Sequence, residues 1–84
     1  MKKVTVYTTT HCPYCVRAKQ LLTRKGIAFE EVNLQDNPDE LNALKKRTGW
    51  KTVPQIFIGE ELVGGFTELA ALASAGQLDQ KLSG

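Results

Sequence analysis

The residues best suited to chemistry are the two cysteines of the chain, which lie in the stretch His11-Cys12-Pro13-Tyr14-Cys15. The spacing Cys-x-x-Cys suits a redox-active dithiol and also one half of a zinc site. A zinc site normally has four ligands, and only His11 lies beside the pair as a further candidate. Two inert, packed cysteines are the remaining alternative. We favour a dithiol redox centre without a metal, because the motif follows a strand-like run and precedes a helix-like one.

The two thiols are expected to have different roles. Cys12 lies just before the predicted first helical turn, where unpaired backbone N–H groups and the helix dipole favour an anion. A thiolate is the attacking species, so Cys12 is the predicted nucleophile. Cys15 lies about one turn further along the same face, which puts the two Cα atoms roughly 5–6 Å apart and makes Cys15 the predicted resolving thiol. Pro13 stiffens the turn, and Tyr14 offers an apolar wall beside the sulfur.

Strand-like and helix-like patterns alternate around this motif. Asn37 is the predicted N-cap of the second helix, which Pro38 opens and Gly49 ends. The predicted strands are residues 3–8, 27–34, 55–58 and 61–63, and the predicted helices are residues 13–25, 38–48 and 67–75, with a helical tail to residue 82.

The order of these elements predicts the topology. The first strand, helix and second strand form a βαβ unit, so the two strands are expected to be parallel. Gly59-Glu60 is a tight-turn signal, so the last two strands are expected to form an antiparallel hairpin. The order βαβαββα indicates one α/β domain over residues 1–84, with a four-stranded mixed sheet flanked by helices.

The bulk composition excludes several classes of protein. The chain has 84 residues, 42% of them hydrophobic, and a net charge of +2. No Lys/Arg block indicates nucleic-acid binding, and no apolar run is long enough for a membrane span. The apolar run at the N-terminus is too short for a signal peptide, so we expect a cytoplasmic protein. In that reducing compartment a Cys-x-x-Cys pair is more often catalytic or metal-binding than structural.

Three stretches together resemble the glutaredoxins, in the order and spacing of that family and within a match that runs from residue 4 to about residue 82. They are Cys12-Pro13-Tyr14-Cys15, Thr52-Val53-Pro54-Gln55-Ile56-Phe57-Ile58 and Gly64-Gly65-Phe66-Thr67-Glu68-Leu69. The resemblance implies a thioredoxin-like fold, no bound cofactor and glutathione as co-substrate. It also implies a cis peptide bond between Val53 and Pro54, packed against the cysteines. Such a bond exposes the backbone of Val53, with which a peptide can pair as an added strand.

The resemblance further implies a site for the γ-glutamyl end of glutathione. Thr67 is expected to bind its carboxylate through a backbone N–H, and the Glu68 carboxylate is expected to bind its ammonium. Gly64 and Gly65 are expected to offer open N–H donors, although a plain strand-to-helix turn explains two glycines equally well. The predicted glutathione contacts are Thr52, Val53, Pro54, Gly65, Thr67, Glu68, Arg47 and Lys51.

Two positions depart from the family pattern. The family usually has Asp where Glu68 stands, and many members have Lys where this chain has Thr9. That Lys helps to hold the glycine carboxylate of glutathione, so Arg47 and Lys51 are candidates to replace it. Solvated charges at a helix end are the alternative for both residues. Trp50 is a candidate wall of the groove, with ordinary packing as its alternative.

The resemblance therefore implies a monomeric glutathione-disulfide oxidoreductase that reduces protein disulfides and glutathione mixed disulfides through Cys12 and Cys15. One alternative is an electron donor to ribonucleotide reductase that is recycled by thioredoxin reductase, which the missing Lys at Thr9 favours. Another is a module that holds an iron–sulfur cluster between two protomers, which Pro13 disfavours. Gly64-Gly65 with Thr67 and Glu68 favours the glutathione-dependent enzyme.

Overall fold

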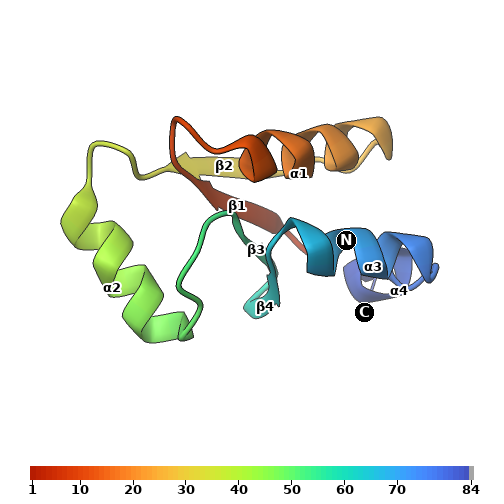
Figure 1. Ribbon diagram of the computed structural model, residues 1–84. Coiled ribbons are helices and arrows are strands. Elements are labelled where there is room, and N and C mark those ends of the chain that lie inside the picture. Colours follow the sequence, from red (N-terminus) through yellow and green to blue (C-terminus); the bar gives the residue numbers. More distant parts are fainter. Residues whose placement is uncertain (84) are drawn as a thin grey trace.

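The computed structural model describes residues 1–83, and its elements follow the predicted order (Figure 1). The second strand begins three residues later than predicted, because Ile27 is used to end the first helix. Gly26, at φ +70°, allows the chain to reverse there, and the Ile27 N–H donates to the Leu22 carbonyl at 2.9 Å. The elements are β1 (Val4–Thr8), α1 (Pro13–Arg24), β2 (Glu30–Asn33), α2 (Pro38–Thr48), β3 (Gln55–Ile58), β4 (Glu61–Gly64), α3 (Phe66–Ser74) and α4 (Leu78–Ser83).

The four strands form one mixed sheet in the order β2-β1-β3-β4. β1 pairs with β2 in parallel and with β3 antiparallel, and β3 pairs antiparallel with β4. The predicted parallel βαβ unit and the antiparallel hairpin are therefore both confirmed. The central position of β1 places the loop that follows Thr8 at the middle of one sheet edge. That loop leads directly into the cysteine motif.

The core lies between the sheet and the helices α1 and α3. In β1, Val4 and Val6 are buried and alternate with the partly exposed Thr5 and Tyr7. The residues that α1 buries lie three and four positions apart, so they form one stripe along the helix. They are Cys15, Ala18 and Leu22. The same periodicity that anchors α1 on the sheet therefore buries the second cysteine.

The helix α2 stands apart from α1 and α3, at the far left of Figure 1. Its backbone cap is Asn37 and it ends at Gly49 in the left-handed conformation, as predicted. The Asn37 side chain makes no capping hydrogen bond, and its amide donates to the Glu40 carboxylate at 2.8 Å. The predicted N-cap is therefore confirmed in position, without the side-chain hydrogen bond that usually accompanies it.

The longest helix of the described chain, α1, has 12 residues. A helix that spans the hydrocarbon core of a bilayer needs about 20 residues. None of the helices within residues 1–83 could therefore cross a membrane.

Candidate active site

Cys12 and Cys15 are joined by a disulfide, with their Cα atoms 5.2 Å apart. Cys12 is the N-cap of α1 and Pro13 occupies its first turn. The Cys15 N–H donates to the Cys12 Sγ at 3.1 Å, so the sulfur occupies the place that a capping oxygen normally takes. This position would favour negative charge on the Cys12 sulfur once the disulfide is reduced, because a backbone donor and the helix dipole both point at it.

The two cysteines differ in exposure. Cys12 is half-buried, whereas Cys15 is 1% exposed and lies in the buried stripe of α1. An incoming disulfide can therefore reach Cys12 but not Cys15. This asymmetry matches the predicted division between an attacking and a resolving thiol.

The peptide bond between Val53 and Pro54 is cis, as the resemblance implied. The Cys12 Sγ lies 3.7 Å from the Val53 carbonyl oxygen. Pro54 is buried, and Val53 belongs to no strand of the sheet. The segment before β3 therefore places backbone groups that belong to no strand next to the Cys12 sulfur.

A groove of about 230 Å³ lies at this place. Three separate parts of the chain form it: the first turn of α1, the segment between α2 and β3, and the start of α3. Six of the eight predicted glutathione contacts line it, all except Arg47 and Lys51. Its lining residues are Tyr14, Trp50, Thr52, Val53, Pro54, Gly65, Phe66, Thr67 and Glu68.

The glycine pair positions Glu68. The Gly65 N–H donates to Glu68 Oε1 at 2.9 Å. Gly64 has φ +126°, and a Cβ there would meet the Glu68 Cγ at 2.9 Å, so only glycine fits beside this side chain. The prediction that Gly65 offers an open N–H donor is therefore wrong, because Glu68 occupies it. What remains for a ligand is the second oxygen of Glu68 and the first N–H groups of α3.

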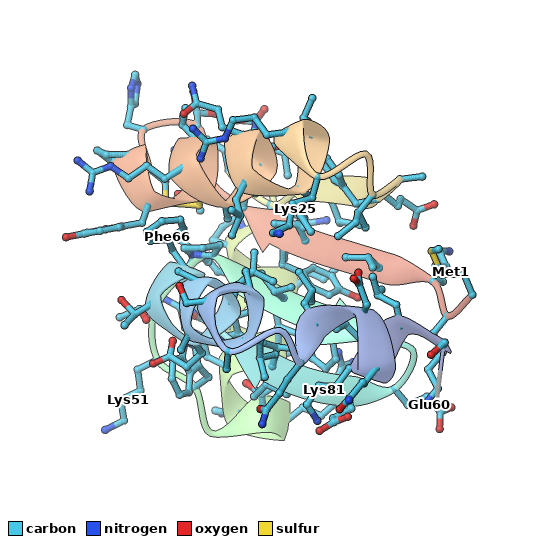
Figure 2. All side chains as sticks on the ribbon, turned by 90° about the vertical axis from the view of Figure 1, so that its right-hand side faces the viewer. Met1, Lys25, Lys51, Glu60, Phe66 and Lys81 are labelled. Atoms are coloured by element: carbon cyan, nitrogen blue, oxygen red, sulfur yellow. A yellow bond between two sulfur atoms is a disulfide. The ribbon has the colours of Figure 1, made fainter. Side chains whose placement is uncertain are left out.

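Aromatic side chains form the wall between α1 and α3. Tyr14 is 54% exposed, and its ring centroid lies 6.3 Å from that of Phe66. Figure 2 shows Phe66 in the space between the two helices. The guanidinium carbon of Arg17 lies 5.2 Å from the Tyr14 centroid and supports that ring from α1. The predicted apolar wall at Tyr14 is present.

Arg47 is not brought to the groove. It lies beside a separate hollow with Thr5, Tyr7 and Phe57. Thr5 and Tyr7 point to the face of the sheet opposite Val4, so the sheet separates this hollow from the core and from α1. The last turn of α2 carries Arg47 to that face, which corrects the predicted place of Arg47 beside Thr52.

Lys51 directly precedes Thr52, but its side chain does not line the groove. It is exposed, and Figure 2 shows it extending outward, away from Phe66. Thr9 likewise is not a lining residue. Among the residues that the structure describes, therefore, the groove wall contains no lysine or arginine.

The sequence left one lining residue out and another undecided. Phe66 was not among the predicted contacts, although it lies within the Gly64–Leu69 stretch that carries the resemblance. Trp50 was left open between groove and packing, and it proves to be a wall of the groove. The only available signal for both was an aromatic residue adjacent to a predicted contact.

Two carboxyl groups have a lowered pKa, and neither lines the groove. The Thr8 hydroxyl donates to Glu31 Oε2 at 2.7 Å and is the main reason that the pKa of Glu31 is lowered, with Lys19 at 3.0 Å adding to it. A hydrogen bond from Lys81 at 2.9 Å lowers the pKa of the exposed Glu61. Within residues 1–83, no group of three or more His, Cys, Asp or Glu side chains could hold a metal ion.

Comparison with known proteins adds independent findings. A family model described as Glutaredoxin matches residues 4–63. The chain is 52% identical over 83 residues to a glutaredoxin of Pseudomonas aeruginosa, with 99% of each chain covered. It is 45% identical over 82 residues to glutaredoxin 3 of Escherichia coli, covering 98% of this chain and 99% of that one. The crystal structure of a buckwheat glutaredoxin–glutathione complex is 30% identical and has a TM-score of 0.88, with 98% of this chain and 77% of the buckwheat chain covered.

Proposed function

The chain belongs to the glutaredoxin family and is a thiol–disulfide oxidoreductase, and we propose that glutathione is its electron donor and that glutathione mixed disulfides are among its substrates. The observation that carries this proposal is the groove beside Cys12, which both Val53 and the start of α3 line. A short peptide with a free amino-acid end fits such a site. The glutathione complex of the buckwheat relative supports the same choice.

The cysteinyl backbone and the γ-glutamyl end of glutathione each have groups that suit them. The cysteinyl backbone pairs with Val53 as an added strand, which places the ligand sulfur beside the Cys12 sulfur. The γ-glutamyl carboxylate binds at the start of α3, where the N–H of Thr67 and the helix dipole favour an anion. The γ-glutamyl ammonium pairs with the Glu68 carboxylate, which the Gly65 N–H holds in place at 2.9 Å.

With a glutathionylated protein, the Cys12 thiolate attacks the glutathione sulfur. The Cys12–glutathione disulfide forms, the old disulfide breaks, and the protein leaves as a thiolate. A second glutathione thiolate then attacks the glutathione sulfur on Cys12, which releases oxidised glutathione and restores the Cys12 thiolate. This route uses only Cys12, the accessible cysteine, and the groove that holds glutathione on it.

With a protein disulfide, Cys12 forms a mixed disulfide with one client sulfur and releases the other as a thiolate. The Cys15 thiolate then attacks the Cys12 sulfur and frees the second client thiolate. The product is the Cys12–Cys15 disulfide, the form that this structure has. Two glutathione molecules reduce it, which is reasonable because glutaredoxin potentials of about −200 to −230 mV lie near the potential of the glutathione pool.

The proposal includes the setting of the enzyme. We expect a monomer in the cytoplasm that acts on glutathionylated and disulfide-containing proteins and contributes to redox homeostasis. Ribonucleotide reductase is one candidate client.

A coupled assay tests the electron donor. The purified protein is given a glutathionylated peptide, and NADPH oxidation is followed with glutathione plus glutathione reductase, or with thioredoxin reductase alone. We expect turnover with the glutathione system only. Turnover with thioredoxin reductase and none with glutathione would reject glutathione as the donor and would favour the alternative hydrogen-donor role.

A further inference from the structure

Trp50 forms part of the groove wall, and its indole N–H is buried without a hydrogen-bond partner among residues 1–83. It is the one buried side-chain nitrogen or oxygen atom of the described chain in that condition. An unpaired buried donor costs about 1–3 kcal/mol. A group that accepts from this N–H would remove that cost and so gain binding free energy.

The backbone of Trp50 is held on both sides. Its N–H donates to the Thr48 Oγ1 at 3.1 Å, and its carbonyl accepts from the Gln55 Nε2 at 2.6 Å. Gln55 is fully buried and also accepts from Thr48, so the three residues form a small closed network. The main chain is therefore fixed, and rotation about the side-chain bonds is the freedom that remains to the indole.

The indole lies next to the expected position of the γ-glutamyl end. Its Cζ2 atom is 3.8 Å from the point where a Cβ on Gly65 would stand, and the Glu68 Oε1 is 3.4 Å from the same point. The ring edge thus borders the start of α3. The N–H itself is buried, so a ligand carboxylate in this groove can accept from it only when the indole ring turns toward the groove.

The side chains that line the groove offer few hydrogen-bond donors. Its described lining residues include no lysine or arginine, Arg47 lies at another hollow, and Lys51 extends outward. The side-chain donors that line the groove are the hydroxyls of Tyr14, Thr52 and Thr67 and the indole N–H of Trp50. Of these, only the indole N–H is buried and without a partner.

We propose that the indole N–H of Trp50 donates a hydrogen bond to a carboxylate of the glutathionyl group held on Cys12. Trp50 is then a binding residue that distinguishes glutathione from disulfide partners without a carboxylate. The proposal rests on the use of glutathione proposed above. It makes a neutral donor, rather than a cationic side chain, the partner of that carboxylate.

The direct test observes the indole N–H by NMR. Because the chain has one tryptophan, a ¹⁵N-labelled protein gives a single indole signal. In Cys15→Ser protein, the Cys12 thiolate attacks oxidised glutathione and releases one glutathione thiolate, which leaves a stable Cys12–glutathione disulfide. The same reaction with cystamine leaves a cysteamine disulfide without a carboxylate. We expect the indole proton to move downfield and to exchange more slowly with glutathione only, and identical spectra for the two adducts would overturn the proposal.

Two further adducts identify the carboxylate. γ-Glutamylcysteine amide keeps only the γ-glutamyl carboxylate, and cysteinylglycine keeps only the glycine carboxylate. A downfield shift with γ-glutamylcysteine amide alone assigns the bond to the γ-glutamyl end, and a shift with cysteinylglycine alone assigns it to the glycine end. A shift with neither would count against the proposal.

A kinetic test uses Trp50→Phe, which keeps an aromatic wall and removes the N–H. We expect KM for a glutathionylated peptide to rise about tenfold with kcat unchanged, and the thermal midpoint to stay close to that of the parent protein. An unchanged KM would overturn the proposal. If the parent protein shows no glutathione-dependent turnover, the proposed function fails instead, and the comparison of the adduct spectra still decides the role of Trp50.

Discussion

The Cys12 sulfur lies 3.7 Å from the carbonyl oxygen of Val53, a residue 41 positions away in the sequence. This contact joins the reactive group to the backbone that we expect to hold its substrate. Because Cys12 caps α1 and Val53 precedes β3, the distance between them depends on how α1 packs on the sheet. The position of a bound substrate relative to the Cys12 sulfur therefore depends on both stretches of the chain and not on either one alone.

The two cysteines are expected to separate two activities. Cys15→Ser removes the resolving thiol but leaves Cys12, so it should retain reduction of a glutathionylated peptide and lose reduction of a protein disulfide. Cys12→Ser should lose both activities, because Cys15 is 1% exposed and cannot reach a client. The two substrates are compared in the glutathione-coupled assay. Retained activity in Cys12→Ser would contradict the assignment of the nucleophile.

Adding a side chain at Gly65, which lines the groove, is expected to weaken glutathione binding without disturbing the fold. At Gly65 an added Cβ meets the Glu68 Oε1 at 3.4 Å and the Pro54 carbonyl oxygen at 3.6 Å, and the φ of −99° suits any residue. Gly65→Ala should therefore fold normally and raise KM for a glutathionylated peptide about tenfold, the effect of losing roughly 1.4 kcal/mol of binding. Steady-state kinetics and thermal unfolding measure the two effects.

The matched control is Gly76→Ala. Gly76 has φ +70° and no atom within 4 Å of an added Cβ, and it lies outside the groove. This variant should lose about 1 kcal/mol of stability through backbone strain and keep its KM. Equal KM changes in the two variants would show that Gly65→Ala acts through stability rather than through the groove.

Glu68→Gln is expected to remove the charge that pairs with the γ-glutamyl ammonium. The amide oxygen can still accept from the Gly65 N–H, so the start of α3 should stay in place. We expect KM for a glutathionylated peptide to rise about tenfold, since a charged hydrogen bond is worth about 1.5–3 kcal/mol. Glu60→Gln, which neutralises a carboxylate outside the groove, should leave KM unchanged. A normal KM in Glu68→Gln would exclude this ion pair.

Glu31 is expected to make stability depend on pH. Its pKa is lowered in the folded protein, first by the hydrogen bond from Thr8. The contribution of Glu31 is therefore fully present above the ordinary glutamate pKa of about 4.3 and is lost as the pH falls through the lower folded value. Since the side chain is partly exposed and screened by solvent, we expect Glu31→Gln to cost at most about 1 kcal/mol at pH 7.

Urea unfolding at pH 7, 5 and 3 measures this effect. The difference between the parent protein and Glu31→Gln should be largest at pH 7 and should shrink toward pH 3. Thr8→Val removes the main donor and should reduce the pH dependence that Glu31 confers. Glu30→Gln is the control, because Glu30 pairs at 3.4 Å with Lys3 on the open surface and should change stability little. A difference that grows on acidification would contradict the assigned sign.

Local features of this protein could be predicted from its sequence because they depend on neighbouring residues. The spacing of Cys12 and Cys15 sets their Cα separation within one helical turn, and Pro13 marks where that helix begins. The apolar periodicity of the following residues places Cys15 on the buried side. The element order, the parallel pairing of the first two strands and the antiparallel hairpin follow from the same kind of pattern. The reaction class followed from the Cys-x-x-Cys spacing in that context, so the sequence alone determined it.

Only the tertiary structure decided which distant groups share the groove. Arg47 and Lys51 are close to Thr52 in sequence, yet the orientation of α2 carries Arg47 to the opposite face of the sheet, and Lys51 points outward. Glu68 takes up the Gly65 N–H, and Trp50, a lining residue, has a buried indole N–H with no partner within residues 1–83. The physical reason is that helix and strand periodicity fix directions within one element, whereas the position of one element against another depends on the packing of the whole core.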